Sequence, residues 1–368
     1  MLRRPAPLDS IVCLALAAVA LAILAGCGDS AEATPPAAAK AWAGASSAKS
    51  ANTTIYSVTV LATLGGSFGS ANAINDSGQV VGNSTTSGDR VGHAYLNIGG
   101  ALRDLASPGS DYGEADAVNE KGQAIGISIT GGDPCCLHGF VYREGALQDL
   151  GRRAMPHGIN NQGQFVGSVE EAGSAKRAFV EVAGSIQILG TLGGSTGSAE
   201  AINDKGQIVG GSAVKGDTAT HAFLFDGGSM RDLGTLGGNH SYATAVNGQG
   251  EAVGYSNLPG DTAQHAFLYR GGRMRDLGSL GGSHSLATAI NEQGLVVGFS
   301  RLEKENVTHA FVYDGGVMSD LNDLLDSSGA GWALKEARGI NKAGRIVGTG
   351  TLNGVQKAFM LSPVRSTR

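Results

Sequence analysis

A ten-residue phrase recurs along the chain, mostly at intervals of 41 to 44 residues with a last step of 50. It reads AINDSGQVVG at Ala73 and AINDKGQIVG at Ala201. A second phrase is repeated too: HAFLFDGGSMRDLGTLGG at His221 returns 44 residues later as HAFLYRGGRMRDLGSLGG. Repeats of this length are typical of arrays in which each copy buries its apolar face only against its neighbours. The asparagines of the first phrase are Asn75, Asn119, Asn160, Asn203, Asn247, Asn291 and Asn341.

Each repeat predicts four short strands. The segment ATAIN alternates small and apolar residues, and the Asn-x-x-Gly stretch after it suits a tight hairpin, because Asn caps its own turn and Gly adopts positive φ. The segments QVVGxS, HAFLY and RMRDL supply the other three strands, and GTLGG leads into the next repeat. Glycine accounts for 59 of 368 residues and apolar runs are only four to six residues long, which disfavours helices.

Four antiparallel strands in every repeat predict an all-β, seven-bladed β-propeller of four-stranded blades. A β-solenoid is the alternative, but its coils are usually shorter and its strands parallel. The ends of the repeat region favour the propeller, because residues 55–66 match a fourth strand and its crossover, whereas residues 357–363 form a third strand with no fourth strand after it. We therefore expect the N-terminal strand to close the last blade, which leaves no edge strand unpaired.

The residues before the repeats have a different composition. Two arginines are followed by an apolar run over residues 11–26, whose length of about 24 Å is short of a hydrocarbon core of about 30 Å. The run ends in LAGC, residues 24–27, which resembles a bacterial lipobox. Residues 1–26 are therefore predicted to be a lipoprotein signal peptide, with Cys27 as the lipidated mature N-terminus. An ordinary secretory signal, in which Cys27 has no role, is the alternative.

The rest of the chain divides into three parts. Residues 27–54 are rich in Ala, Ser, Thr and Pro without apolar periodicity and indicate a flexible linker. Residues 55–363 form the repeat region, and residues 364–368 are a short tail. Gly28 rather than an aspartate follows the lipobox cysteine, so we expect the lipid to hold the chain in the bacterial outer membrane, facing the periplasm or the surface. We also expect the protein to be a monomer.

The charge and the absent motifs limit the function. Loss of Arg3, Arg4 and Asp9 with the signal peptide changes the net charge from −5 to −6, which argues against nucleic acid as a partner. The sequence contains no Ser-His-Asp set, paired-carboxylate motif, Gly-Lys phosphate loop or His-x-x-x-His spacing. We therefore predict no enzyme, no cofactor and no metal ion.

The repeated phrases resemble the bacterial extracellular HAF-repeat proteins. HAFLYRGGRMRDLGSLGG and AINEQGLVVGFS carry the resemblance, and GWALKEARGINKAGRIVGTG, residues 331–350, is similar to that family's usual terminal repeat. The resemblance covers about residues 55–363 and implies an exported, repeat-built β protein. It implies no catalytic residues and no ligand. The third repeat departs from the pattern, because it has RAFV at Arg177 and the crossover GRRAMPHGIN.

Histidine begins the third strand in five repeats. Equivalent residues of neighbouring blades would lie about 14 Å apart, whereas zinc donors lie about 2.1 Å from one ion. Arg177 and Lys357 occupy the same position, and what they share with histidine is hydrogen-bond donation. We interpret the position as structural, with Asp232 and Asp276 as expected acceptors, and the repeated asparagines in the same way. These structural positions are His93, His138, His221, His265, His309, Asn75, Asn203, Asn247 and Asn291.

Binding is expected on the variable loops of one rim. The loop GGDPCC brings Cys135 and Cys136 near Arg152, Arg153 and His157, which follow the same blade. Paired arginines suit a carboxylate or a phosphate. Adjacent Cα atoms lie about 3.8 Å apart, below the usual disulfide window, so a bond between the cysteines would be strained and the sequence leaves it open. The alternative is an ordinary loop with two thiols.

The final crossover contains Trp332, which either stacks on a sugar or fills the seam between the last and first blades; we favour the seam. Together these features predict a membrane-anchored binding module at the cell envelope or surface, with an envelope protein or a glycan as its ligand. Two alternatives remain. One is a hydrolase or lyase with its site at the central channel, and the other is a purely structural envelope or matrix protein.

Overall fold

The computed structural model describes the repeat region, which consists of β-strands. Its described residues contain 28 strands and three short 3-10 segments, η1 (Pro259–Asp261), η2 (Leu321–Leu324) and η3 (Ser327–Gly329). Among these residues no helix is long and apolar enough to cross a membrane. The predicted signal peptide and Cys27 lie outside the described residues, which are 54–105, 112–130, 133–170, 175–303 and 307–364.

Five antiparallel sheets have four strands each. One contains β2 (Gly65–Ile74), β3 (Val80–Thr86), β4 (Gly92–Ile98) and β5 (Ala101–Asp104). The next contains β6 (Gly113–Val118), β7 (Ala124–Thr130), β8 (Asp133–Arg143) and β9 (Ala146–Gly151). The third contains β10 (Ala154–Ile159), β11 (Phe165–Glu170), β12 (Lys176–Val182) and β13 (Ser185–Ile188). The fourth contains β14 (Gly193–Ile202), β15 (Ile208–Val214), β16 (Thr220–Asp226) and β17 (Ser229–Asp232). The fifth contains β26 (Trp332–Ile340), β27 (Ile346–Leu352), β28 (Val355–Val364) and β1 (Ile55–Val60).

A larger sheet holds the remaining strands. Its first half contains β18 (Ser241–Val246), β19 (Ala252–Asn257), β20 (Gln264–Arg270) and β21 (Arg273–Asp276). Its second half contains β22 (Gly281–Ile290), β23 (Val296–Leu302), β24 (Thr308–Asp314) and β25 (Val317–Asp320). One parallel pair, Gln264 with His284, joins the two halves.

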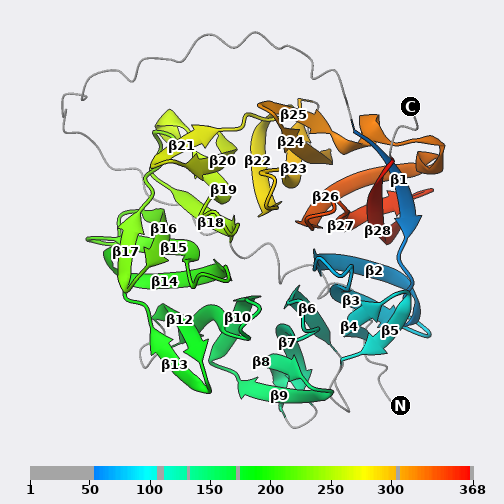
Figure 1. Ribbon diagram of the computed structural model, residues 1–368, viewed down its shortest axis with the longest axis horizontal. Helices are drawn as coiled ribbons and strands as arrows, with labels where there is room; N and C mark the ends of the chain where they lie inside the picture. The colour runs from blue at the N-terminus through cyan, green and yellow to red at the C-terminus, as the bar shows by residue number, and fades with distance from the viewer. Residues whose placement is uncertain (1–53, 106–111, 131–132, 171–174, 304–306, 365–368) are drawn as a thin grey trace, which may run out of the picture. The chain divides into compact units, whose positions relative to one another are not determined.

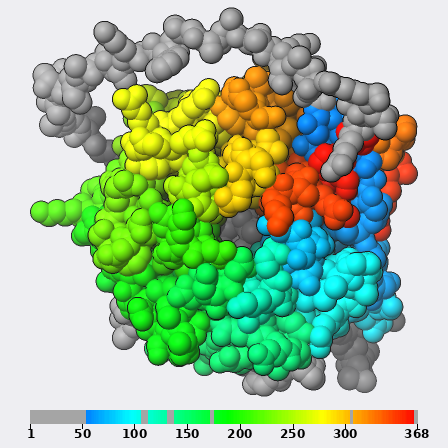
Figure 2. Space-filling model, in the orientation of Figure 1, coloured from blue at the N-terminus to red at the C-terminus, as the bar shows by residue number. Residues whose placement is uncertain are grey.

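The sheets surround a central axis, and the innermost strand of each is the first of its repeat (Figure 1). Figure 2 shows the same ring of sheets around a central opening. The fold is all-β, as the sequence predicted. Within each repeat the strands pair antiparallel, which is the pairing of a propeller and not of a solenoid.

The N-terminal strand completes the last sheet. β1 pairs antiparallel with β28, from Ile55 beside Val364 to Val60 beside Phe359. Tyr56 and Val58 of β1 are buried in the cluster of that sheet. The first strand of the described chain therefore occupies the outer place that the last repeat leaves empty.

The core lies between neighbouring sheets. The aromatic residue of each HAF-like phrase is at most 1% exposed and packs in a cluster shared with the preceding sheet, as Phe223 does with Val166 and Ala178. The seven aromatic residues are Tyr95, Phe140, Phe179, Phe223, Phe267, Phe311 and Phe359. Gly210 follows the two apolar residues of β15, and a Cβ there would lie 2.0 Å from the main-chain oxygen of Ser198. The glycine of the VVG phrase thus permits the bulged inner strand to lie close.

Trp332 lies at a different seam from the one predicted. Its ring meets that of Phe359 edge-on at 6.1 Å and 83°. It packs against the cluster in which residues of the last sheet meet Val297, Ala310 and Val312 of the preceding sheet. Another cluster fills the seam between the last sheet and the sheet of β2–β5. The expectation for the last-to-first seam was wrong because Trp332 begins the inner strand β26, on the side of the preceding sheet.

Candidate functional site: the central channel

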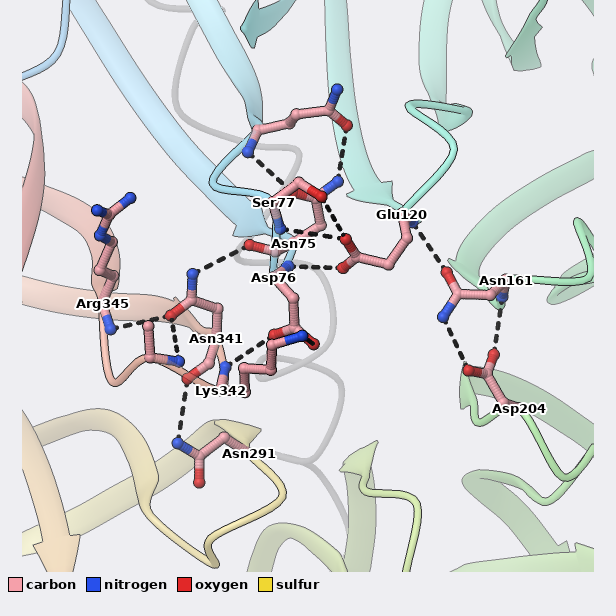
Figure 3. Close-up of polar contacts among 12 residues, drawn as sticks. Asn75, Asp76, Ser77, Glu120, Asn161, Asp204, Asn291, Asn341, Lys342 and Arg345 are labelled. Atoms are coloured by element: carbon pink, nitrogen blue, oxygen red, sulfur yellow. Dashed lines mark hydrogen bonds and ion pairs between the residues drawn. The ribbon is translucent and has the colours of Figure 1, made fainter. Parts of the chain in front are cut away.

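Seven asparagines at the ends of the inner strands form a closed ring of hydrogen bonds. The Nδ2 atom of Asn75 donates to the main-chain oxygen of Asn119 at 2.8 Å, and Asn341 donates back to Asn75 at 3.1 Å (Figure 3). Each of the other five donates in the same way to the asparagine of the next sheet. All seven are buried. The last bond spans 266 positions of sequence, so the ring joins the two ends of the repeat region.

Each ring asparagine also holds its own turn. Asn203 Oδ1 accepts from the main-chain nitrogens of Lys205 and Gln207, both at 3.0 Å. Its main-chain oxygen accepts from Gly206 N at 3.0 Å. One side chain thus serves both the hairpin and the junction with the next sheet. The sequence predicted that the asparagine caps its own hairpin turn but not that it bonds to the next sheet.

The residue after the ring asparagine makes a second set of bonds between sheets. Glu120 Oε1 accepts from Asp76 N at 2.6 Å, and Asn161 Oδ1 accepts from Glu120 N at 2.8 Å (Figure 3). Asp204 Oδ1 accepts from Asn161 N, and Asp76 Oδ1 from Lys342 N, both at 2.8 Å. Polar side chains at this mouth of the channel are therefore occupied in joining sheets.

The third residue before each ring asparagine differs from repeat to repeat, although alanine, glycine or proline flanks it. In three repeats it donates to a main-chain oxygen of the next inner strand: Asn72 to Ala115 at 3.1 Å, Thr244 to Ala287 at 2.7 Å and Thr288 to Ala337 at 2.8 Å. In the other four it is titratable. Of the residues at this position, only His157 was a predicted site residue, and it was assigned to the rim. The titratable residues are Asp116, His157, Glu200 and Arg338.

Asp116 lies at the electrostatic centre of these residues. Burial raises the pKa of Asp116 well above its usual range, Glu114 and Glu200 raise it further, and Arg338 opposes them. Glu114 lies on the same inner strand as Asp116, whereas Glu200 and Arg338 belong to inner strands of two other sheets. Glu114 is 7% exposed and accepts from Asn72 Nδ2 at 2.8 Å and from Tyr112 Oη at 2.7 Å.

Glu200 collects donors from two sheets. Its Oε1 atom accepts from Ser198 Oγ at 2.8 Å and from Tyr242 Oη at 2.5 Å. His157 Nδ1 lies 3.9 Å from Glu200 Oε2. The ring of Tyr242 stacks on that of Tyr255 at 5.8 Å and 12°. Burial, together with the charge of Glu200, raises the pKa of the Tyr242 hydroxyl well above its usual range, so Tyr242 stays a donor.

Two buried polar atoms of this region lack a hydrogen-bond partner. They are Asn72 Oδ1 and Arg338 Nε, from a set of six such atoms in the described part of the chain. The neighbouring Nη2 atom of Arg338 donates to Glu336 Oε2 at 2.5 Å. Buried polar groups are usually paired, so these two atoms are exceptions among the described residues.

The residues predicted to form one rim patch do not all lie together. Arg152 and Arg153 are exposed between β9 and β10. His157 instead lies in β10, with its side chain toward Glu200. Cys135 and Cys136 belong to β8 and not to a loop, because that strand begins at Asp133. The side chains of both cysteines lie outside the described residues.

The histidines of the third strands bind the aspartates of the fourth strands. His221 Nδ1 lies 2.8 Å from Asp232 Oδ2, and His265 Nδ1 lies 2.9 Å from Asp276 Oδ1. Three further pairs repeat the contact: His93 with Asp104, His138 with Asp149, and His309 with Asp320.

Two repeats have Lys357 or Arg177 in place of the third-strand histidine, and these side chains donate to main-chain oxygens instead of an aspartate. Lys357 Nζ donates to the main-chain oxygen of Ser67 at 2.8 Å, and Arg177 Nη1 to that of Ser195 at 3.4 Å. Within the residues that the structure covers, no group of three or more His, Cys, Asp or Glu side chains is placed to hold a metal ion.

No family model and no curated protein sequence matches this chain. Among solved structures, the β-propeller domain of the Trilobed protease from Pyrococcus furiosus is similar, with a TM-score of 0.54, 11% identity and coverage of 80% of this chain and 93% of that one. A puromycin-hydrolyzing peptidase from Mycobacterium tuberculosis has a TM-score of 0.54 and 13% identity over 85% of this chain and 55% of its own. TolB from Acinetobacter baumannii has a TM-score of 0.44 and 10% identity over 79% of this chain and 64% of its own. The chain thus spans little more than half of the peptidase and under two thirds of TolB. At these identities the likeness shows the β-propeller fold alone.

Proposed function

We propose that this chain is a seven-bladed β-propeller that serves as a binding module of the bacterial cell envelope and takes its ligand in the central channel. The count of seven treats β18–β21 and β22–β25 as two blades. A single parallel pair joins those two sets of strands, and the asparagine ring has one member for each of seven repeats.

One observation carries the site assignment: the variable inner-strand position. Thr244 and Thr288 show that a neutral hydroxyl satisfies this position by donating to the next sheet. The titratable side chains at this position are only partly buried, yet burial and neighbouring carboxylates still raise the pKa of Asp116 well above its usual range. Perturbed ionisable groups that converge in a cleft are typical of functional sites. Ligand binding would explain why charged residues occupy this position, whereas packing between blades does not require a charge there.

A thermal-shift screen tests the assignment. Wild type, Glu200→Gln and the double variant Arg152→Ala/Arg153→Ala would be screened against sugars, sugar acids, amines and cell-wall fragments. We expect at least one compound to raise the melting temperature of wild type and of the arginine variant but not of Glu200→Gln. Compounds that stabilise Glu200→Gln but not the arginine variant would place the site on the rim. The purely structural alternative predicts no stabilising compound.

The second candidate is a hydrolase or lyase with its site in the same channel. Asp116 favours it, because a carboxylic acid with a raised pKa beside a second carboxylate is the pattern of acid–base catalysis. Turnover of a glycan, ester or lactone by the purified chain, lost in Asp116→Asn, would establish this alternative. Binding without turnover supports the non-enzymatic module.

We also propose that the chain is an exported HAF-repeat lipoprotein anchored through Cys27. The support is the LAGC segment at the end of the apolar run and the repeated phrases. Stable anchoring needs more than one acyl chain, which bacterial lipoproteins carry. Cys27→Ser should move the protein from the membrane fraction to the soluble fraction. A variant that stays with the membrane would contradict the anchor.

A further inference from the structure

A pocket of about 370 Å³ lies between three neighbouring blades. Ser198 of β14 and Tyr242 of β18 line it, and both donate to Glu200. The pocket therefore adjoins the channel site. Its volume is at the lower end of the range of small-molecule pockets, about 300 to 1,000 Å³, so it suits a ligand the size of one sugar ring.

Gly211 explains why the pocket lies in this repeat. A Cβ atom at Gly211 would lie 2.2 Å from Cδ2 and Cε2 of the Tyr242 ring, so the ring can occupy its place only beside a glycine. Gly211 also lines the pocket. The other repeats place a larger residue at this position, two after the second apolar residue of the VVG phrase: Asn83, Ile127, Ser168, Tyr255, Phe299 and Thr349.

The lining offers three kinds of contact. The ring of Tyr242 provides an apolar wall, and Thr196, Ser198 and Thr220 provide hydroxyls. Lys176 is exposed and is the one charged residue among the lining residues that the structure describes. A pyranose has an apolar ring face and a rim of hydroxyls, and a carboxylate on it would pair with the ammonium group.

We propose that this pocket binds a sugar acid, a pyranose that carries one carboxylate. Lys176 pairs with the carboxylate, Tyr242 packs against the ring, and Thr220 and Ser198 bind ring hydroxyls. The proposal rests on the proposed binding function and names the ligand class of that site.

Isothermal titration calorimetry of the full chain with D-glucuronate, D-galacturonate and the neutral sugars D-glucose and D-galactose tests the proposal. We expect one of the two sugar acids to bind at least about tenfold more tightly than its neutral counterpart, a difference of about 1.4 kcal/mol. Lys176→Gln should abolish that preference. Because Lys176 is exposed, the variant should fold. Lys121→Gln is the matched control, since Lys121 is also exposed but lies in the turn after a ring asparagine, at the other end of the strands.

A second variant tests the pocket itself. Gly211→Ala displaces the Tyr242 ring and should weaken binding of the sugar acid at least tenfold, and circular dichroism would verify that the variant is folded. Equal binding of acids and neutral sugars, a preference that survives Lys176→Gln, or no binding of either acid would overturn the proposal. If neither acid binds while other screened compounds still depend on Glu200, the ligand class is wrong and the channel site stands. If no compound depends on Glu200, the proposed function itself fails.

Discussion

Two positions at the end of each inner strand, three residues apart, behave in opposite ways. The ring position is asparagine in all seven repeats, and each time its side chain donates to the next ring asparagine and accepts from the main-chain nitrogen four residues on. The position three residues before it holds Asn, Asp, His, Glu, Thr or Arg. The varied residue lies within the inner strand, and the ring asparagine follows the end of that strand. The asparagine makes a hydrogen bond that every junction between repeats needs. The varied residue is not required at every junction, so it can differ where it contacts a ligand.

The two positions also differ in energetic terms. Each ring asparagine satisfies buried main-chain groups that would otherwise lack partners, which is where a hydrogen bond contributes most. Asp116 instead sits where burial and neighbouring carboxylates oppose its ionisation. Local features that cost stability are expected at functional sites.

Deletion of residues 55–62 should have the largest effect. It removes β1, the partner of β28, and with it the buried side chains of Tyr56 and Val58. The ring would then end in an unpaired edge, and we expect loss of the cooperative thermal transition or aggregation. Removal of residues 28–54 is the control and should leave the transition in place. An unchanged melting temperature after the first deletion would contradict closure by β1.

Asn203→Ala should lower the free energy of unfolding by about 2–4 kcal/mol, because it leaves the main-chain groups of its turn and of Asn247 without partners. Thr288→Val is the matched control from the varied position, where one hydrogen bond is lost and about 1 kcal/mol is expected. Urea unfolding followed by circular dichroism measures both. A larger loss in Thr288→Val than in Asn203→Ala would reverse the proposed division of roles.

Asp116→Asn should stabilise the protein at neutral pH. The pKa of Asp116 is raised in the folded state, so above about pH 4, the usual range of a free aspartate, the folded chain binds more protons and stability falls as the pH rises. Replacing the carboxylate removes this penalty, and a rise of about 1–3 °C in melting temperature is expected at pH 7. The gain should shrink toward pH 4. A gain of the same size at both pH values would mean that the charge is not its cause.

His265→Ala should cost about 1 kcal/mol, since it removes one partly exposed hydrogen bond to Asp276. Burial raises the pKa of Asp276, but the hydrogen bonds from His265 and Gly278 outweigh burial, so the net pKa is lowered. Ligand affinity should not change, because the pair lies away from the channel residues. Loss of affinity with unchanged stability would place function on the strand histidines.

Arg152→Ala/Arg153→Ala should have the smallest effect on stability, within about 0.5 kcal/mol, because both side chains are exposed. If the rim is a second binding surface, as the sequence predicted, this variant loses affinity for an envelope protein or an anionic glycan in a pull-down. Unchanged capture of such partners would leave the channel as the binding site.

The fold could largely be predicted from the sequence because repetition reports local structure. The alternation in HAFLY and the Asn-x-x-Gly turns indicated strands and hairpins, and the split final repeat indicated pairing of β1 with β28. The bonds from one asparagine to the next could not be derived, since they depend on how closely blades approach. The varied channel position was visible in the aligned phrases, but only the structure shows that its side chains converge.

The site residues were predicted less well, for physical reasons. His157 follows Arg153 closely in sequence, yet an extended strand rises about 3.3 Å per residue and carries it from the rim into the channel. GGDPCC has the composition of a loop, but most of it extends β8 beyond the usual strand length. Trp332 was assigned to the wrong seam, because the sequence does not show which neighbouring blade a side chain meets.

The most direct test of the account replaces the four titratable channel residues by threonine, as in the repeats of Thr244 and Thr288. The variant is Asp116→Thr/His157→Thr/Glu200→Thr/Arg338→Thr. The structure shows that threonine fits this position and bonds to the next blade. The measurement is the dissociation constant, by calorimetry, of the compound that stabilises wild type most strongly in the thermal-shift screen. We expect a folded variant that binds this compound at least about 100-fold more weakly, a loss of about 2.7 kcal/mol in binding free energy. A folded variant with the affinity of wild type would contradict this expectation.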